Sequence, residues 1–306
     1  MKKYAIAIIC ISVIIAMFLF LLKFLLMPKN NTVEIVFTTD KYYKDYLITT
    51  INSAIANKKE SSIYNIHILC VDLSEKDIEK FEKLAKNNVN IYPMPLKLET
   101  IKDLGKYKVD YHVTRADLFK FFMPQLFPEL DKILYIDVDT VILKDLTELY
   151  NTRLGNKYLG AVNKCIPYKI EKKIWKIKFT KKIFKYNCGV MLLNLKKFRE
   201  DNMTEKLIVS KNNKQYKNLM TQQTFNDVIG QDKIVHLSPI YNTFVQWDED
   251  MFILCHFKQV YWKFCMNINS SEDLFKKAVI IHYLDDNKPW SDKDVLYKDL
   301  WLKYRQ

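Results

Sequence analysis

The alternation of strand-like and helix-like runs early in the chain is the feature that most restricts its fold. The run VEIVFT (33–38) is rich in β-branched residues, ends at the turn-prone pair Thr39-Asp40, and precedes an apolar-periodic stretch through Ala56. The same order recurs as a strand over 64–71, a Glu/Lys-rich helix over 75–86 and a strand over 89–94. Strands that alternate with helices predict an α/β fold with a mostly parallel central sheet.

Two carboxylates follow the next strongly apolar run. The pattern predicts a helix over 115–127 and a buried strand over 131–143, DKILYIDVDTVIL, which contains Asp137 and Asp139. Ligands of open α/β sheets bind beyond the carboxyl ends of the strands. The D-x-D pair is therefore expected at a binding site.

The chemistry of this pair narrows the expectation. Two carboxylates this close repel each other if they are buried without partners, so water or a cation must accompany them. A divalent cation with oxygen ligands would also hold a diphosphate and neutralise charge as a nucleoside diphosphate leaves. A surface turn with two solvated aspartates is the alternative, since D-x-D is common by chance.

A second candidate segment is HYLDDNKPW, from His282 to Trp290. His282 is able to complete a metal shell, and Lys288 is able to meet a phosphate. Taken alone, a histidine after the apolar run AVII is more typical of a buried structural residue than of a ligand. Its combination with the D-x-D pair favours the ligand interpretation.

Five segments, in order, resemble glycosyltransferase family 8, the retaining enzymes that include glycogenin and bacterial lipopolysaccharide galactosyl- and glucosyltransferases. They are VFTTDKYY (36–43), the helix ending LFKFFMP before DKILYIDVD, YNCGVMLLNLKKFR (186–199), TQQTFN (221–226) and HYLDDNKPW. The resemblance implies a GT-A fold, Rossmann-like with a mostly parallel central sheet. It also implies metal-dependent, retaining transfer of a hexose, glucose or galactose, from a UDP-sugar to a cell-surface or lipid-linked glycan.

The resemblance assigns roles residue by residue. It implies Mn²⁺ or Mg²⁺ held by Asp137, Asp139 and His282. It implies that the nucleotide sugar is bound by Thr38, Thr39, Asp40, Tyr43, Lys120, Asp137, Val138, Asn187, Cys188, Gln222 and Lys288. In the YNCGV segment, the alternative is a buried strand start in which a turn requires Gly189.

Three of these residues are the expected catalytic ones: Gln222, Asp139 and Lys288. Gln222 matches the family's glutamine on the reactive face of the anomeric carbon, and Lys288 matches its diphosphate-binding lysine. Because an amide is a poor covalent nucleophile, we favour a same-face attack in which the leaving diphosphate helps to accept the acceptor's proton.

Four positions depart from the family pattern. Thr221 and Gln223 replace the aspartates that flank Gln222, Asp285 replaces a glycine, and Lys164 replaces an aspartate. An aspartate beside a diphosphate is electrostatically unfavourable. The departures predict altered donor or acceptor choice or reduced activity, and they leave a catalytically silent glycan- or nucleotide-sugar-binding relative as the alternative.

The N-terminus predicts a membrane anchor. Residues Tyr4 to Leu22 carry no charge, and nineteen residues at 1.5 Å each cover most of a hydrocarbon core. A cleaved signal peptide is the alternative, although no A-x-A-like site follows. We therefore expect an anchor and linker over 1–31 and a catalytic domain over 32–306 in a single-pass membrane protein. Flanking lysines leave its side open, either bacterial and facing the cytoplasm or lumenal as in the Golgi.

The net charge of +13 indicates an anionic partner, for which nucleic acid, a lipid surface and a phosphorylated substrate all qualify. No nucleic-acid-binding motif accompanies it, so nucleic acid is not expected as a partner. The segment 169–185 holds eight lysines and one acid among aromatic and aliphatic residues. It favours a membrane-surface element that presents the acceptor; a solvated helix is the alternative. The six cysteines indicate neither a zinc site nor a disulfide framework.

Overall fold

The protein is described here by a computed structural model. It covers residues 31–97, 115–168, 173–174, 177–178, 181–213, 221–245, 267–284, 286 and 288–305. Only the backbone is described at 115, 165–168, 173–174, 177–178 and 181–184. The expected anchor over Tyr4 to Leu22 and the departure at Asp285 lie outside the described residues. Within them, no helix combines the length and the hydropathy that crossing a bilayer requires.

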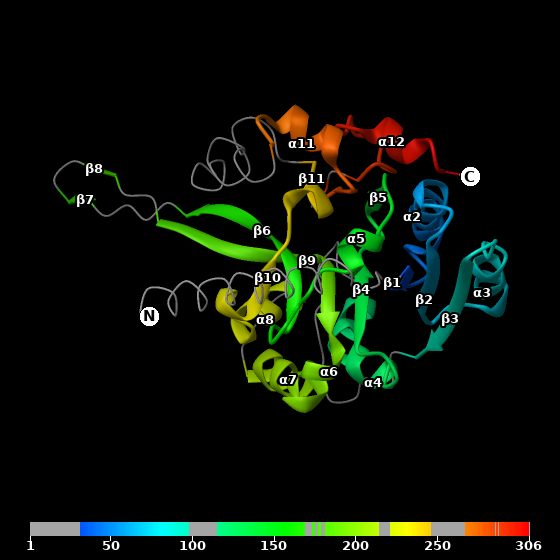
Figure 1. The fold of residues 1–306 in the computed structure, drawn as a ribbon, viewed down its shortest axis with the longest axis horizontal. Coiled ribbons are helices and arrows are strands. Elements are labelled where there is room, and N and C mark those ends of the chain that lie inside the picture. Colours follow the sequence, from blue (N-terminus) through cyan, green and yellow to red (C-terminus); the bar gives the residue numbers. More distant parts are fainter. Residues whose placement is uncertain are drawn as a thin grey trace, which may run out of the picture. The chain divides into compact units, whose positions relative to one another are not determined.

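A seven-stranded sheet forms the centre of the domain (Figure 1). Its order is β10-β6-β9-β4-β1-β2-β3, and every pairing is parallel except those of β9 with β4 and β6. The bounds are β1 Thr32–Thr39, β2 Ile63–Val71, β3 Val89–Leu96, β4 Lys132–Ile136, β6 Leu159–Tyr168, β9 Lys181–Asn194 and β10 Ile234–His236. The expected mostly parallel α/β sheet is therefore confirmed.

Two smaller sheets accompany the central one. A three-stranded sheet has the order β11-β12-β5, and β7 pairs with β8 in a separate antiparallel ribbon. The bounds are β5 Thr140–Ile142, β11 Thr243–Phe244, β12 Ile280–His282, β7 Lys173–Ile174 and β8 Ile177–Lys178. The three-stranded sheet matters for function because β5 follows Asp139 and β12 carries His282.

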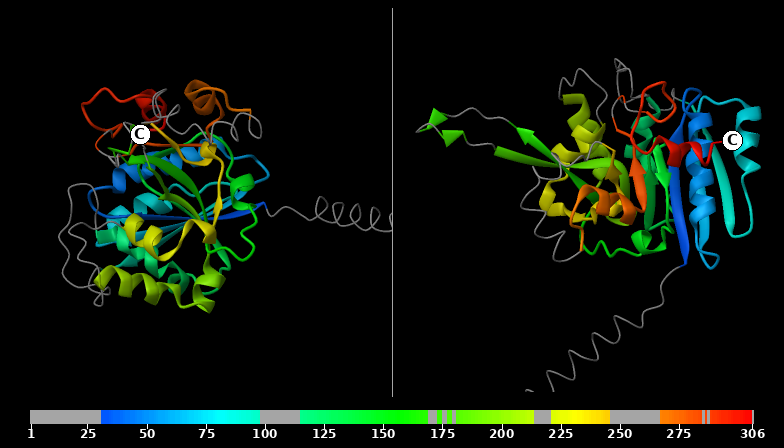
Figure 2. Two further views of the ribbon diagram at one scale, coloured as in Figure 1. Left: turned by 90° about the vertical axis from the view of Figure 1, so that its left-hand side faces the viewer. Right: turned by 90° about the horizontal axis from the view of Figure 1, so that it is seen from above.

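Helices cover both faces of the central sheet. One apolar cluster packs α2, α5 and α11 against β1, β2 and β4, and a second packs η3, α4, α6, α7 and α8 against the opposite face. The bounds are α2 Lys44–Asn57, α3 Glu75–Glu82, η3 Arg115–Phe122, α4 Met123–Leu126, α5 Thr147–Tyr150, α6 Leu195–Glu200, α7 Met203–Asn213, α8 Thr221–Val228, η4 Gln231–Lys233, η5 Pro239–Tyr241, α11 Ser271–Lys277 and α12 Lys298–Leu302. Figure 2 shows the sheet between α7 on one side and the C-terminal helices on the other.

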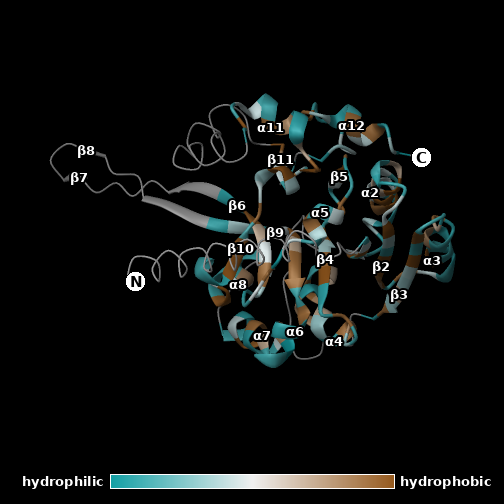
Figure 3. Ribbon diagram, viewed as in Figure 1, coloured by the Kyte–Doolittle hydropathy of each residue, from teal (hydrophilic) through white to brown (hydrophobic). Residues whose placement is uncertain are grey.

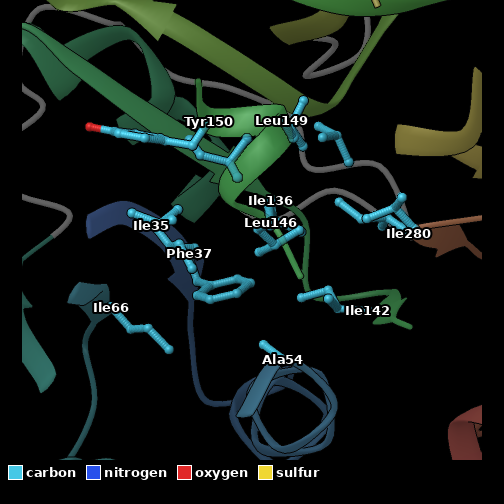
Figure 4. Packing of buried hydrophobic residues seen from close by; sticks show 14 of the residues in the cluster. Ile35, Phe37, Ala54, Ile66, Ile136, Ile142, Leu146, Leu149, Tyr150 and Ile280 are labelled. Atoms are coloured by element: carbon cyan, nitrogen blue, oxygen red, sulfur yellow. The ribbon is translucent and has the colours of Figure 1, made fainter. Parts of the chain in front are cut away.

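Burial on both faces explains why the central strands read as nearly continuous apolar runs. Ile35 and Phe37 of β1 share one core with Ala54 of α2 (Figure 4), whereas Val36 belongs to the core on the other face. Hydrophobic residues accordingly follow the strands of the sheet, and α3 is largely hydrophilic (Figure 3). The two cores fix the positions of the strand ends.

Several local expectations are confirmed and two are corrected. The strands and helices expected between 33 and 94 are present as β1, α2, β2, α3 and β3. The helix expected over 115–127 is mostly a 3₁₀ helix, η3, followed by a single turn of α-helix, α4. The described parts of 169–185 are strands and not a solvated helix, because β6 and β9 pair from Asn163↔Tyr186 out to Tyr168↔Lys181. The membrane-surface hypothesis for that segment concerns side chains outside the described ones.

Candidate active site

The two aspartates lie in the connection between the central sheet and the three-stranded sheet. The amide of Asp137 donates to the carbonyl of Gly189 in β9 over 2.7 Å, and the amide of Tyr283 donates to the carbonyl of Asp139 over 3.0 Å. The single strand expected over 131–143 is therefore wrong. It divides into β4 and β5 because its two halves bond to different sheets. The D-x-D pair occupies the point of division.

One oxygen of each aspartate faces His282. The Nε2 atom of His282 lies 3.0 Å from Oδ1 of Asp139 and 3.8 Å from Oδ2 of Asp137. One ligand atom from each of the three residues lies within 4.8 Å of the other two. Oδ1 of Asp139 is buried and, within the described part of the chain, accepts no hydrogen bond. A buried carboxylate oxygen without a donor, beside a second carboxylate and an imidazole nitrogen, fits a divalent metal ion.

The other oxygen of each aspartate is paired with a lysine. Lys120 Nζ lies 3.0 Å from Oδ1 of Asp137, and Lys288 Nζ lies 2.5 Å from Oδ2 of Asp139. The Tyr135 hydroxyl also donates to Oδ1 of Asp137, over 2.5 Å. Each lysine therefore pairs with one oxygen of an aspartate. The remaining oxygens, Oδ2 of Asp137 and Oδ1 of Asp139, face His282.

These pairings set the charge states of the site. Burial alone would raise the pKa of Asp139, but the charge of Lys288 outweighs it and holds that pKa below its usual value. Burial would lower the pKa of Lys120, yet the carboxylates of Asp117 and Asp137 hold it above its usual value. Burial raises the pKa of Tyr135, and the Asp137 carboxylate raises it further, so its hydroxyl stays a donor. The site thus pairs Lys288 with Asp139, and Lys120 with both Asp117 and Asp137.

Lys120 is also tied to a third carboxylate, that of Asp117 one turn earlier in η3. The other oxygen of Asp117 accepts a hydrogen bond from the hydroxyl of Thr221, the first residue of α8. The departure at Thr221 is therefore part of a buried network, where the hydroxyl meets a carboxylate supplied by η3. The chain Thr221-Asp117-Lys120-Asp137 links the start of α8 to the D-x-D pair.

The segment YNCGV places two predicted donor-binding residues beside Gln222. Nδ2 of Asn187 donates to Oε1 of Gln222 over 2.9 Å, and the amide of Cys188 donates to the same oxygen over 3.3 Å. Asn226, one turn after Gln222, donates to the Tyr186 carbonyl and accepts from the Tyr186 amide. These bonds fasten α8 to β9, so Asn187, Cys188 and Gln222 form one unit.

Gly189 is required here for a reason other than a turn. It lies inside β9, and a Cβ atom built on it would lie 2.1 Å from Cε1 of His282 and 2.6 Å from Oδ2 of Asp137. The turn considered from the sequence is thus wrong. A glycine is needed because the side chains of His282 and Asp137 pass directly over the strand.

The residues expected to bind the nucleotide lie at the end of β1 and in the loop before α2. Because β1 and β4 are parallel neighbours, this end lies at the same sheet edge as the D-x-D pair. The Asp40 side chain accepts from the amide of Tyr42 over 2.9 Å, which shapes the loop. Burial raises the pKa of Tyr43 to about 12, and the Asp139 and Asp40 charges add to the effect. Tyr43 therefore remains a donor close to Asp139.

Four other predicted or departing positions play different parts. The Val138 side chain packs against the core, and its carbonyl lies 2.6 Å from the Thr50 hydroxyl. Thr38 and Thr39 are both buried, and Oγ1 of Thr38 has no hydrogen-bond partner within the described residues. Lys164 pairs in register with Lys185 on the β6-β9 ribbon.

Sequence reasoning missed Asp117, Tyr135 and Asn242. Tyr135 carried a usable signal, because a residue two before Asp137 on a strand points to the same face. Asp117 stands three residues before Lys120, the spacing of neighbours on one helical face. Asn242 lies between η5 and β11 and carried no signal, because its contacts with Asn187 and His282 are far away in sequence.

Comparisons with known proteins show the family of this chain. A family model described as glycosyl transferase family 8 matches residues 34–294. GlyE, a glycosyltransferase of Streptococcus pneumoniae serotype 4, is 24% identical over 284 residues, which make up 90% of this chain and 61% of GlyE.

Solved structures share the fold. The bifunctional glycosyltransferase WbbM matches with a TM-score of 0.67 at 23% identity, over 92% of this chain and 50% of WbbM. The galactosyltransferase LgtC, solved with donor and acceptor sugar analogues, matches with a TM-score of 0.64 at 18% identity, over 89% of this chain and 95% of LgtC. This chain thus spans nearly all of LgtC but only part of GlyE and WbbM.

Proposed function

Because this chain belongs to glycosyltransferase family 8, we propose that it is a retaining, metal-dependent hexosyltransferase that moves glucose or galactose from a UDP-sugar to a glycan acceptor. The observation that carries this proposal is the convergence of Asp137, Asp139 and His282 at the sheet edge, with Lys288 beside them. The name of LgtC, a galactosyltransferase, supports a hexose donor.

The site residues divide into two groups by the part of the donor that they meet. Asp137, Asp139 and His282 hold Mn²⁺ or Mg²⁺, which supplies positive charge to the diphosphate when bound. Lys288 exchanges its contact with Asp139 for one with the diphosphate and stabilises the charge that develops on the leaving group. Thr38, Thr39, Asp40 and Tyr43 bind the nucleoside end.

Gln222, Asn187 and Cys188 bind the donor hexose, with Lys120 alongside. Oε1 of Gln222 already accepts two hydrogen bonds, and an amide oxygen is a weak nucleophile, so Gln222 orients the sugar and forms no bond to it. Burial raises the pKa of the Cys188 thiol, which keeps it protonated and unreactive. Both observations favour a same-face attack in which the leaving diphosphate accepts the acceptor's proton.

The acceptor is proposed from the sequence. An N-terminal anchor and the basic segment 169–185 would hold the enzyme at a membrane, where a lipid-linked or cell-surface glycan would be presented. Binding of residues 32–306, without the expected anchor, to vesicles with and without anionic lipid tests the basic segment separately. Equal binding to both kinds of vesicle would remove the basic segment from the proposal.

The donor is tested by thermal unfolding of the full-length chain with a panel of nucleotide sugars, with and without Mn²⁺. A UDP-hexose at one hundred times its Kd is expected to stabilise the protein by about 2.7 kcal/mol, and only when metal is present. Asp139→Asn is the matched variant and should lose the effect. Metal-dependent release of an α-hexose from UDP-hexose confirms turnover with retention. Binding without turnover would instead favour the silent relative, and stabilisation only by other nucleotide sugars would contradict the proposed donor.

A further inference from the structure

Asn242 is a fully buried residue that joins the metal-ligand histidine to the donor-sugar segment. Its Oδ1 lies 2.9 Å from Nδ1 of His282, and its Nδ2 donates to Oδ1 of Asn187 over 2.8 Å. It is neither one of the three candidate metal ligands nor one of the expected sugar-binding residues.

The direction of these hydrogen bonds follows from a backbone donor. The amide of Gly189 donates to Oδ1 of Asn187 over 2.8 Å, and a backbone N–H can only donate. The atom of Asn187 at this point is therefore its oxygen, and the atom of Asn242 that faces it is the NH₂ group. The remaining atom of Asn242, its oxygen, faces Nδ1 of His282. Nδ1 must then carry the proton.

A proton on Nδ1 leaves a lone pair on Nε2 of the neutral imidazole. That lone pair faces Oδ1 of Asp139, 3.0 Å away, and Oδ2 of Asp137, 3.8 Å away. Three acceptors converge with no proton between them, which suits a cation. The opposite tautomer would place an N–H on Nε2, where Asp139 would accept it and close the site. Without Asn242, Asp139 would favour that closed tautomer.

The same residue reaches the sugar-binding side. Oδ1 of Asn187 accepts a hydrogen bond from Nδ2 of Asn242, and Nδ2 of Asn187 donates one to Oε1 of Gln222. A continuous chain of side-chain hydrogen bonds therefore runs from Gln222 through Asn187 and Asn242 to His282. The orientation of every member follows from the amides of Cys188 and Gly189.

We propose that Asn242 is a positioning residue that holds His282 in the Nδ1–H tautomer and thereby couples the metal ligands to Gln222. The coupling to donor sugar rests on the proposed function, whereas the tautomer does not. Second-sphere partners of metal-ligating histidines commonly set tautomer and ring orientation, and their loss lowers metal affinity about 10- to 100-fold.

The tautomer is tested by NMR of the full-length chain labelled with ¹⁵N-histidine, free of metal at pH 8. The chain has five histidines, so His282→Gln assigns the signal. The wild type is expected to show His282 protonated on Nδ1, and Asn242→Ala is expected to shift it to Nε2. An unchanged Nδ1–H signal in Asn242→Ala would overturn the proposal, whether or not the protein transfers sugar.

Metal affinity, followed by Mn²⁺ EPR, distinguishes positioning from general destabilisation. Asn242→Ala should bind Mn²⁺ about 10- to 100-fold more weakly. Asn242→Asp keeps an acceptor for Nδ1–H but loses the donor to Asn187, so it should bind Mn²⁺ more tightly than Asn242→Ala does, while the KM for the donor rises. Asn163→Ala is the matched control, because it removes another Asn–His contact, with His236 over 2.8 Å.

Two outcomes would count against the proposal. One is equal Mn²⁺ affinity of wild type and Asn242→Ala, and the other is an equal loss of affinity in Asn163→Ala. If the wild type binds Mn²⁺ but no UDP-sugar, the proposed function fails and the tautomer assignment stands.

Discussion

His282 leaves no room for a side chain at Gly189: a Cβ atom there would lie 2.1 Å from Cε1 of the imidazole. Gly189→Ala is therefore expected to displace His282 and Asp137 and to abolish detectable Mn²⁺ binding. Overpacking of this kind typically costs about 1–3 kcal/mol of the free energy of unfolding. Urea denaturation and Mn²⁺ EPR measure the two effects.

Gly155 provides the control for that substitution. It has a left-handed φ of +53°, and a Cβ on it meets nothing within 4 Å. Gly155→Asn suits that backbone conformation and should leave both stability and metal binding nearly unchanged. Normal Mn²⁺ binding by Gly189→Ala would show that the metal lies elsewhere.

The bond between Thr221 and Asp117 predicts that the two residues can exchange roles. Thr221→Asp alone places two carboxylates together in a buried site, and Asp117→Thr alone leaves Lys120 with one carboxylate. Each is expected to destabilise the protein and to slow UDP-sugar hydrolysis. The double variant restores a hydroxyl–carboxylate pair, with the carboxylate now at position 221 and the hydroxyl at position 117.

A double-mutant cycle measures this exchange. We expect a coupling free energy of about 0.5–3 kcal/mol from urea denaturation, with hydrolysis partly recovered in the double variant. Strictly additive losses would mean that the Thr221-Asp117 contact does no more than fill space. Recovery would also show that an aspartate at position 221 can support hydrolysis when position 117 supplies the hydroxyl.

Lys288 is predicted to serve both the diphosphate and the ionisation of Asp139. Lys288→Met keeps most of the side-chain volume and removes the charge, which should lower kcat about 10²- to 10³-fold. Without this cation, burial raises the pKa of Asp139. Protons then compete with Mn²⁺ at higher pH than in the wild type.

Mn²⁺ EPR between pH 4 and 8 checks the second effect. The binding curve of Lys288→Met should move to higher pH, while Lys288→Arg should stay close to the wild type because its charge is retained. Superimposable curves for Lys288→Met and the wild type would contradict the predicted link between Lys288 and Asp139.

The sequence predicted the features that depend on local patterning. The strands and helices from β1 to β3 were recognisable because the spacing of their apolar residues differs. Apolar residues recur about every two residues in the strands and about every 3.6 residues in the helices. The location of Asp137 and Asp139 at a strand end followed from the same reasoning. His282 and Lys288 could be joined to them through the family resemblance, since no local pattern connects positions so distant in the chain.

The remaining features depend on contacts between distant segments. The division of 131–143 is set by bonds from Asp137 to Gly189 and from Tyr283 to Asp139, which the strand's own residues do not encode. For Gly189 the sequence suggested a turn only as an alternative, because the passage of His282 over the strand cannot be recognised from the sequence. Asn242 acts only through Asn187 and His282, so spacing rules could not find it.

Asp77 gives a pH-dependent prediction away from the site. A hydrogen bond from Lys44 and a second one from Ser74 lower its pKa from 3.8 to about 2, and the ion pair with Lys44 joins α3 to α2 over 2.6 Å. A carboxyl group with a lowered folded-state pKa stabilises the protein above its unfolded-state pKa, and this contribution is lost as pH falls through the folded-state value.

Asp77→Asn should therefore destabilise the protein by a constant amount above about pH 4, and by less and less toward about pH 2. The ion pair is partly exposed to solvent, which limits the expected difference to about 1 kcal/mol. Urea denaturation of both proteins between pH 2 and 6 measures this difference in the free energy of unfolding.

Glu272→Gln, which removes an exposed pair with Lys276, is the control and should show no measurable difference at any pH. A difference between Asp77→Asn and the wild type that stays constant down to pH 2 would mean that the loss is one of packing and not of charge.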